Sequence, residues 1–581
     1  MTEPSDQKTA SRLVPQAALR PDMTVRQVAY DFPACWEVFV RYGEPADRQP
    51  RGRLIPLQRF AQERGLRLQP FLEELAAAAG VPVDWAGYRN QTVHRPLLAG
   101  ALVLGLSLGA GWGAYLLWQI GWAGSFQAAA VGHVIAHGEA QFWGFLVPFI
   151  AGIALRWLPT ATRTPGASRG QVGLIGVGLL VGVVGGFAWA VHPQAWLGVV
   201  SASALVLAAG ALASFLVART ATRLTQPWAV GVAAAGGWLC LWAGFTWWLR
   251  AASGLQGPQA FTEAQRAALI ELALMGVAVN AVYGFGLRLL PGMVGGKVVS
   301  SRAMGAVGLH NGAAAVLLAS TLRAWPVGEV AGWTGVLLAT LLFVFALPSL
   351  YRPRSFSPRP EQGPWVLAYY VPLAVAWLIA GVTLLWAGQV GALWFATSVP
   401  HAWRGAARHA LTVGFVSTLI LGVGQRLVPI LEHALLAWPR LALPILVLVA
   451  SGNVWRVGTE LATLWWPGAF RWMPFSALLE LSALGLFSAN LLRTMWPPAD
   501  PLVTRGTVTP STPLAVCLAE HPWLEDRMLA WGLDYLARTR SVPRELTLAS
   551  LARSHGWEPA ALVAAIQEAL AEARPGGAIQ K

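Results

Sequence analysis

Charged residues are scarce in this 581-residue chain, at 12% of the positions, which is too few for the surface of a large water-soluble protein. The three cysteines, Cys35, Cys240 and Cys517, lie far apart and form no CxxC pair. A disulfide framework and a thiolate metal site are therefore not expected. The net charge of +14 does not predict nucleic-acid binding, because the arginines fall in short loops between apolar runs, where positive charge usually records membrane orientation.

Hydrophobic residues make up 55% of the chain, and glycine and tryptophan are abundant. Between residues 95 and 497, twelve apolar runs are long enough to cross a bilayer. The sequence therefore predicts an all-α fold, a polytopic bundle of twelve transmembrane helices in contact with membrane lipid. The predicted spans lie near 97–118, 129–157, 171–191, 194–217, 228–250, 264–290, 303–322, 330–350, 365–387, 404–428, 441–462 and 474–494.

A spaced motif of glycine, arginine and proline occurs three times in these runs. It falls on the second, sixth and tenth predicted spans, as Gly144, Arg156 and Pro159, then Gly276, Arg288 and Pro291, then Gly414, Arg426 and Pro429. An internal repeat of this length outranks any single motif in deciding architecture. We therefore expect three four-helix pseudo-repeats, at roughly 97–217, 228–350 and 365–494.

Polar segments flank the membrane portion. Residues 1–90 and 505–575 are each expected to form a soluble helical domain, and Gly43 and Gly65 of the first correspond to Gly532 and Gly556 of the second. Two copies of one helical module are therefore predicted. Positive residues are concentrated in alternate loops, for example Arg219, Arg223, Lys297, Arg302 and Arg440, which predicts that both termini are cytoplasmic.

Ionisable residues gather near the start of the three motif-bearing spans. Glu139, Glu271 and His409 each lie five residues before the glycine of their own repeat, so the repeat makes their positions equivalent. An ionisable group at membrane depth is costly and is kept where it has a partner or a task. Glu139 and Glu271 are therefore candidates for proton handling.

Histidines on membrane helices suggest a cofactor, because a neutral imidazole is a good axial ligand for haem iron. His137 and His409 are the candidate ligands, and His133, one turn before His137, could ligate or donate a hydrogen bond to a ligand. The alternative is that each histidine bonds a neighbouring helix, and this alternative is favoured for His310. Gly138, Gly144 and Gly414 are expected to leave room for a flat macrocycle, and Arg404, Arg408 and Arg471 are candidate partners for its propionates.

The stretch His409-Ala-Leu-Thr-Val-Gly414, followed by Arg426, resembles the hallmark of the NnrS family of bacterial membrane proteins. The stretches from His137 to Phe145 and from Arg288 to Pro291 are also similar, so the resemblance covers about 95–495. It implies a twelve-span protein of the bacterial inner membrane that is associated with nitric oxide stress and binds haem.

Members of that family have also been linked to copper. The candidate metal ligands would then be His137, His409 and His310. The chain departs from the family's His-x-His-Glu pattern, because Glu139 and Ala140 stand at the second histidine and at the glutamate. This departure argues against copper.

The threefold set of four helices also resembles the catalytic subunit of haem–copper oxidases and nitric oxide reductases. In those enzymes spans two and ten supply low-spin haem ligands, a placement that His137 and His409 match. Ala407 stands where they carry a further histidine, so a full binuclear centre is not implied. The terminal modules resemble the small helical domain of iron–sulfur cluster repair proteins without its cysteine pair, which leaves docking to a cytosolic protein or regulation as their expected role.

These patterns together favour a membrane b-type haem protein with one haem between the second and tenth spans, acting in nitric oxide response or electron handling. One alternative is a nitric oxide reductase-like enzyme that takes electrons from quinol or a cytochrome. The other is a cofactor-free transporter, because internal repeats and midmembrane carboxylates also fit that class.

Overall fold

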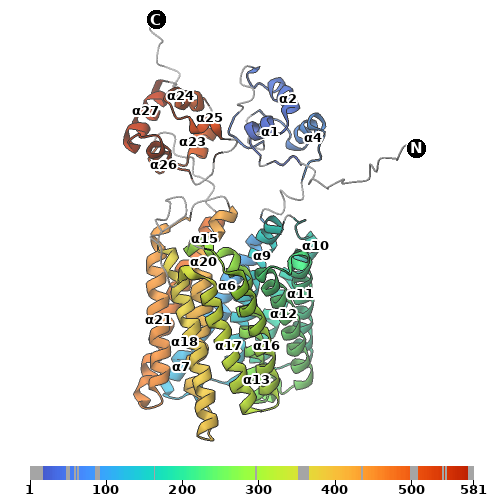
Figure 1. The fold of residues 1–581 in the computed structure, drawn as a ribbon, viewed down its shortest axis with the longest axis vertical. Helices are drawn as coiled ribbons and strands as arrows, with labels where there is room; N and C mark the ends of the chain where they lie inside the picture. The colour runs from blue at the N-terminus through green and yellow to red at the C-terminus, as the bar shows by residue number, and fades with distance from the viewer. Residues whose placement is uncertain are drawn as a thin grey trace, which may run out of the picture. The chain divides into compact units, whose positions relative to one another are not determined.

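A computed structural model describes most of the chain. The described residues are 18–21, 23–46, 53–57, 60–61, 64–84, 92–162, 164–294, 297–350, 366–432, 436–496, 508–521, 523–539, 542 and 546–572. The chain divides into two compact units (Figure 1). One unit comprises residues 1–91 and 498–581, and the other comprises residues 92–497.

The described residues of the second unit form twelve helices that are long and apolar enough to cross a membrane, which confirms the predicted all-α polytopic bundle. Spans 1 to 4 are His94–Ala123, Val131–Thr162, Arg169–Val191 (α10) and Ala195–Arg223. Spans 5 to 8 are Pro227–Ser253 (α12), Glu263–Leu289, Ser300–Leu322 (α16) and Pro326–Ala346 (α17). Spans 9 to 12 are Leu367–Trp394 (α18), His401–Glu432, Pro439–Ala462 and Pro467–Met495.

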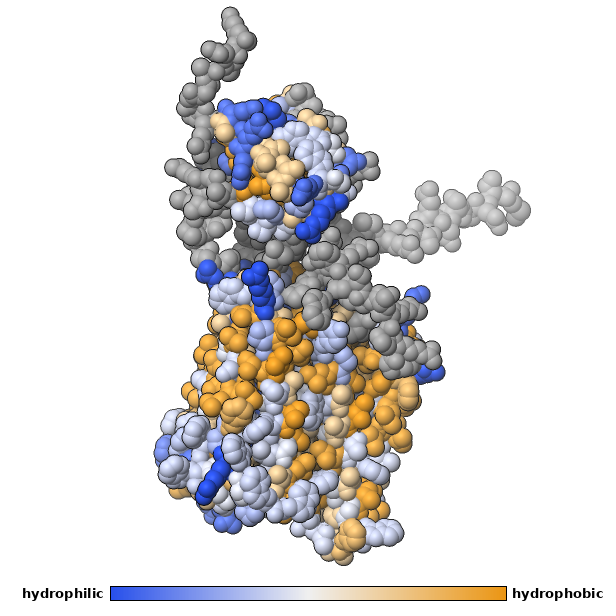
Figure 2. Space-filling view, turned by 90° about the vertical axis from the view of Figure 1, so that its left-hand side faces the viewer, coloured by the Kyte–Doolittle hydropathy of each residue, from blue (hydrophilic) through white to orange (hydrophobic). Residues whose placement is uncertain are grey.

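The outer surface of this unit is apolar, as a lipid-facing surface must be. Val177, Leu207 and Leu338 are among the large side chains it exposes, and a broad hydrophobic band is visible in Figure 2. Tryptophans such as Trp122 and Trp394 are exposed where spans 1 and 9 end, which is typical of the aromatic belt at a membrane interface.

Small residues allow the spans to pack closely. A Cβ added at Gly231 of span 5 would lie 2.7 Å from the backbone nitrogen of Gly284 in span 6, so these two backbones nearly touch. Without a hydrophobic driving force between helices in lipid, such close packing is a main source of helix association.

Spans 2, 6 and 10 share a local irregularity. In each, an α-helix ends at the polar residue of the repeat and a π-helical segment follows at once. The pairs are α8 (Val131–Glu139) with η5 (Ala140–Leu146), α13 (Glu263–Glu271) with η8 (Leu272–Val279), and α19 (His401–His409) with η11 (Ala410–Ser417). Span 1 contains a further π-helical segment, η3 (Gly105–Gly111). In all three spans the π-helical segment therefore begins four residues before the motif glycine, and π-helical segments often mark functional positions.

The terminal unit contains two modules with matching backbone pairings. Thr24, just before α1 (Val25–Asp31), pairs with Pro56, and Pro513, just before α23 (Leu514–Glu520), pairs with Thr547. The predicted glycine pairs, Gly43 with Gly532 and Gly65 with Gly556, all have positive φ angles, which residues with a side chain rarely adopt. The two halves of this unit therefore share these local features.

Each module has its own apolar core. In the first, α2 (Trp36–Arg41) and α4 (Leu68–Ala79) bury Phe39 and Leu72. In the second, α24 (Leu524–Ala530), α26 (Leu548–Ser554) and α27 (Pro559–Glu572) bury Leu524 and Ile566.

The two modules contact one another, which their separate positions in the sequence did not predict. Arg26 of the first module is buried, forms an ion pair with Glu525 and donates a hydrogen bond to the carbonyl of Leu536. Leu54 packs into the core of the second module.

Burial raises the pKa of the Cys35 thiol to about 12, so this cysteine stays protonated and structural.

Candidate functional site

His137 lies on span 2 and faces span 1. Its Nδ1 atom lies 2.9 Å from the carbonyl oxygen of Gly109, so Nδ1 carries the proton and donates it to that oxygen. Gly113 makes room for the ring, because a Cβ there would lie 2.5 Å from the Cε1 atom of His137. Among the described residues, Nε2 of His137 has no hydrogen-bond partner.

His409 lies on span 10 and also uses Nδ1 as a donor, but to a carbonyl one turn back on its own helix. Its Nδ1 atom is 2.9 Å from the Gly405 carbonyl oxygen and 3.4 Å from Oε2 of Glu460 on span 11. Glu460 is buried and held by Arg456, whose Nη1 atom is 2.8 Å from the same carboxylate oxygen. Within the described part of the chain, Nε2 of His409 also makes no hydrogen bond.

The two histidines therefore present the geometry of metal-ligating imidazoles, in which one ring nitrogen donates to a carbonyl or carboxylate and the other keeps its lone pair. Imidazole nitrogens of this kind are donors that a haem iron accepts as axial ligands.

His133 and His310 have different surroundings. The ring of His133 packs against Trp112, with 5.4 Å between centroids. His310 is buried, and its Nε2 atom lies 2.8 Å from the carbonyl oxygen of Met275 in η8. Because a π-helical segment leaves carbonyl groups without their usual partner, His310 has the geometry of the helix–helix hydrogen bond favoured for it from the sequence.

The carboxylate of Glu139 is held by an arginine that the sequence reasoning missed. Nη2 of Arg250 on span 5 lies 2.6 Å from Oε2 of Glu139, and Nη1 donates to the Ser201 hydroxyl at 2.7 Å. The Arg250 guanidinium also lies 5.1 Å from the centre of the Trp189 ring. Glu139 therefore belongs to a buried ion pair.

Glu271, the second candidate for proton handling, has no such partner. Its Oε1 atom accepts a hydrogen bond from the Thr321 hydroxyl at 2.9 Å. Its Oε2 atom is buried and has no hydrogen-bond partner among the described residues. The structure thus distinguishes two carboxylates that the repeat made equivalent.

The three candidate propionate arginines have different surroundings. Arg404 forms an ion pair with Glu263 of span 6. Arg404 and Arg408 both line a cavity that also contains Glu271. Arg471 is exposed on η13 (Pro467–Trp472).

Two of the three glycines expected to leave space instead bring helices together. A Cβ at Gly144 would lie 3.1 Å from Val183, and one at Gly414 would lie 2.4 Å from the Asn453 side chain, so for these two the prediction was wrong. Gly138 has open space around it.

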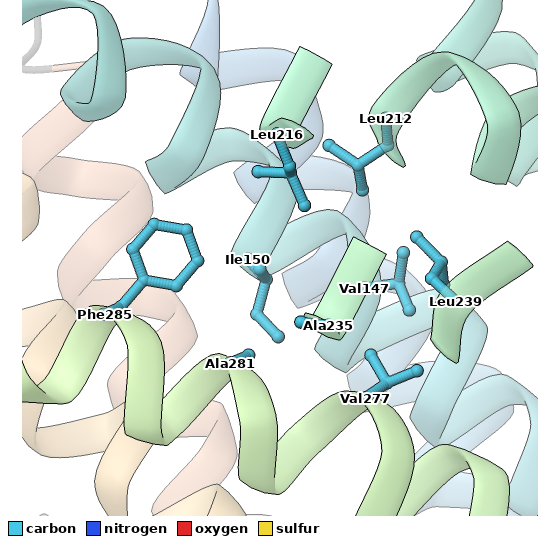
Figure 3. Close-up of a pocket in the computed structure, with 9 residues that line it drawn as sticks. All are labelled: Val147, Ile150, Leu212, Leu216, Ala235, Leu239, Val277, Ala281 and Phe285. Atoms are coloured by element: carbon cyan, nitrogen blue, oxygen red, sulfur yellow. The ribbon is translucent and has the colours of Figure 1, made fainter. Parts of the chain in front are cut away.

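A small cavity of about 10 Å³ between spans 2, 4, 5 and 6 also offers no site, because it is barely large enough for one water molecule. Its walls are entirely apolar, as Figure 3 shows.

The repeat did not point to Arg250, Arg456 and Glu460, because they lie on spans 5 and 11, outside the three motif-bearing spans. A signal was present, since each is an ionisable residue inside an apolar run, and Arg456 and Glu460 are four residues apart on one helix face. The described residues contain no group of three or more His, Cys, Asp or Glu side chains that could hold a metal ion. A haem iron does not require one, because its porphyrin supplies the equatorial ligands.

The chain matches no model of a known protein family and no curated protein. Its function is therefore inferred from the geometry of the site and from the motif resemblance.

Proposed function

We propose that the protein is an integral membrane b-type haem protein in which His137 and His409 are the two axial ligands of one haem between spans 2 and 10. The observation that supports this proposal is the shared hydrogen-bond pattern of the two imidazoles. In both rings Nδ1 is a fixed donor and Nε2 has no described hydrogen bond.

A haem with two imidazole ligands supplies one-electron transfer when bound. The surrounding residues would set its properties through the ligands. The Gly109 carbonyl orients His137, whereas His409 also faces the carboxylate of Glu460, and a carboxylate acceptor makes an imidazole more basic. Arg456 limits this effect by neutralising part of the charge on Glu460.

A role in the response to nitric oxide rests on the motif resemblance, with nitric oxide, quinol or a cytochrome as the expected partners. If the protein is instead an enzyme that moves protons, Glu271 fits that role better than Glu139. The carboxylate of Glu139 is neutralised by Arg250, whereas one oxygen of Glu271 has no described partner.

The test is to purify the full chain and the variants His137→Ala and His409→Ala in detergent, then to measure haem per protein and the reduced absorption spectrum. Each substitution removes an axial ligand and should lose the haem or leave it five-coordinate. His133→Ala is a matched control because it changes a histidine one turn away on the same helix.

His310→Ala is a second control, because it removes a helix–helix hydrogen bond, and the loss of such a bond destabilises a membrane bundle by only about 0.6 kcal/mol on average. Both controls should keep the wild-type spectrum. A wild-type spectrum in His409→Ala would end the assignment, and a colourless wild-type protein would favour the cofactor-free transporter.

A further inference from the structure

A cavity of about 630 Å³ lies between spans 6, 7, 8, 9 and 10. Glu263, Pro326 and Ser398 line it and are exposed, so the cavity reaches the surface at the end of the bundle where span 6 begins. Its volume falls within the range of small-molecule sites, roughly 300–1,000 Å³. Neither His137 nor His409 lines it, so it is separate from the proposed haem ligands.

Span 10 contributes two arginines to this cavity, and they differ in their pairing. Arg404 forms an ion pair with Glu263, which neutralises both groups. Arg408, one turn further along, has no ion pair within the described part of the chain. A guanidinium has five N–H donors and cannot lose its charge in a protein, so Arg408 offers an unused site for an anion.

Span 6 contributes the opposite charge to the same cavity. One oxygen of Glu271 is bonded to Thr321, while the other is buried and has no partner among the described residues. Glu329 of span 8 adds a second carboxylate to the lining. A cation and two carboxylates that no short-range contact neutralises therefore share one cavity.

The charges define what could occupy the cavity. An anion alone would leave the carboxyl groups of Glu271 and Glu329 without a cationic partner, and a cation alone would leave Arg408 without an anionic one. A ligand with both a carboxylate and an ammonium group satisfies both sides, because Arg408 can grip the carboxylate with two parallel hydrogen bonds and the glutamates can accept the ammonium protons. Apolar side chains form much of the remaining wall, including Ile270, Leu274, Trp333 and Leu385. We propose that this cavity binds a zwitterionic amino acid with an apolar side chain.

Leucine and two analogues that share its branched body test the proposal. The analogue 4-methylpentanoate lacks the ammonium group, and 3-methylbutylamine lacks the carboxylate. Binding of each to the purified full chain is measured by equilibrium dialysis. Leucine should bind, and each analogue should bind about 30-fold more weakly or worse, because removing one partner of a desolvated charge pair costs at least that factor.

Two substitutions locate the site. Glu271→Gln keeps the side-chain shape and an acceptor for Thr321, and Arg408→Gln removes the unpaired cation. Both should weaken leucine binding by a similar factor. The matched control is Arg266→Gln, which removes a charge from span 6 outside the cavity, where Arg266 donates to the Phe261 carbonyl. It should bind leucine like the wild type.

The unfolding temperature without leucine shows whether each variant is folded. If Arg408→Gln is unfolded, Glu271→Gln still tests the proposal. The proposal fails if the wild type does not bind leucine, if either analogue binds as tightly as leucine, or if folded Glu271→Gln binds like the wild type. The haem spectrum of the same wild-type sample is a separate readout. A protein with haem and no leucine binding contradicts only this inference, and one with leucine binding and no haem contradicts only the proposed function.

Discussion

Replacing Arg250 by methionine should destabilise the membrane unit strongly. The Arg250 side chain is fully buried, its Nη2 atom lies 2.6 Å from Glu139, and its Nη1 atom lies 2.7 Å from the Ser201 hydroxyl. Methionine would fill much of the same volume but leave the Glu139 carboxylate without its cation. Removing one partner of a buried ion pair costs about 3–5 kcal/mol of unfolding free energy.

Replacing Glu139 by glutamine should lower the unfolding free energy by less than replacing Arg250 by methionine. Glu139→Gln keeps an oxygen that can accept from Arg250, and Arg250 keeps its bond to Ser201, so a loss of about 1–3 kcal/mol is expected. In the double variant Glu139→Gln with Arg250→Met, neither charge is left alone. The double variant should therefore lose less unfolding free energy than the two single variants together, by about 0.5–3 kcal/mol.

Reversible unfolding in mixed detergent and dodecyl sulfate micelles gives the three free energies. Arg302→Met is a suitable control, because Arg302 is exposed and, among the described residues, donates only to the Phe345 carbonyl, at 3.2 Å. It should change the unfolding free energy by no more than about 0.5 kcal/mol. The ion-pair reasoning is refuted if Arg250→Met costs less than about 1 kcal/mol, or if the costs of the two single substitutions add exactly as independent sites do.

Reporters fused after residues 20 and 575 should both be cytoplasmic, given the positive residues of alternate loops, and a periplasmic signal at either end would overturn the predicted orientation. The Cys35 thiol, with its pKa raised to about 12, should react with a thiolate-specific reagent at pH 8 only after unfolding, whereas rapid labelling of the folded chain would contradict its burial. Gly113→Ala should lower haem content, because the added Cβ would lie 2.5 Å from Cε1 of His137, while Gly100→Ala in the same span, with open space around it, should not.

Much of the fold could be predicted because its signals are local. Each span is a continuous apolar run, so hydropathy alone is enough to find twelve of them. The spacing of Glu139, Glu271 and His409 before the motif glycines also indicated a shared role, and each of these residues is followed by a π-helical segment. Periodicity and spacing thus place residues along a helix.

The partners of those residues could not be predicted, because sequence spacing does not say which helices are neighbours. Glu139 is 111 residues from Arg250, yet their side chains form an ion pair. His409 likewise faces Glu460 on span 11. The cavity was missed for the same reason, since Arg408 and Glu271 were considered as separate candidates and only the packing of spans 6 to 10 brings them to one space.

The most direct test of the proposed function is the absorption spectrum of the detergent-purified full chain, oxidised and reduced, together with its haem content. If His137 and His409 are the axial ligands, the sample contains one b-type haem per chain with the spectrum of a six-coordinate, low-spin iron. A protein that is colourless after purification, or whose haem is five-coordinate, would contradict ligation by this histidine pair.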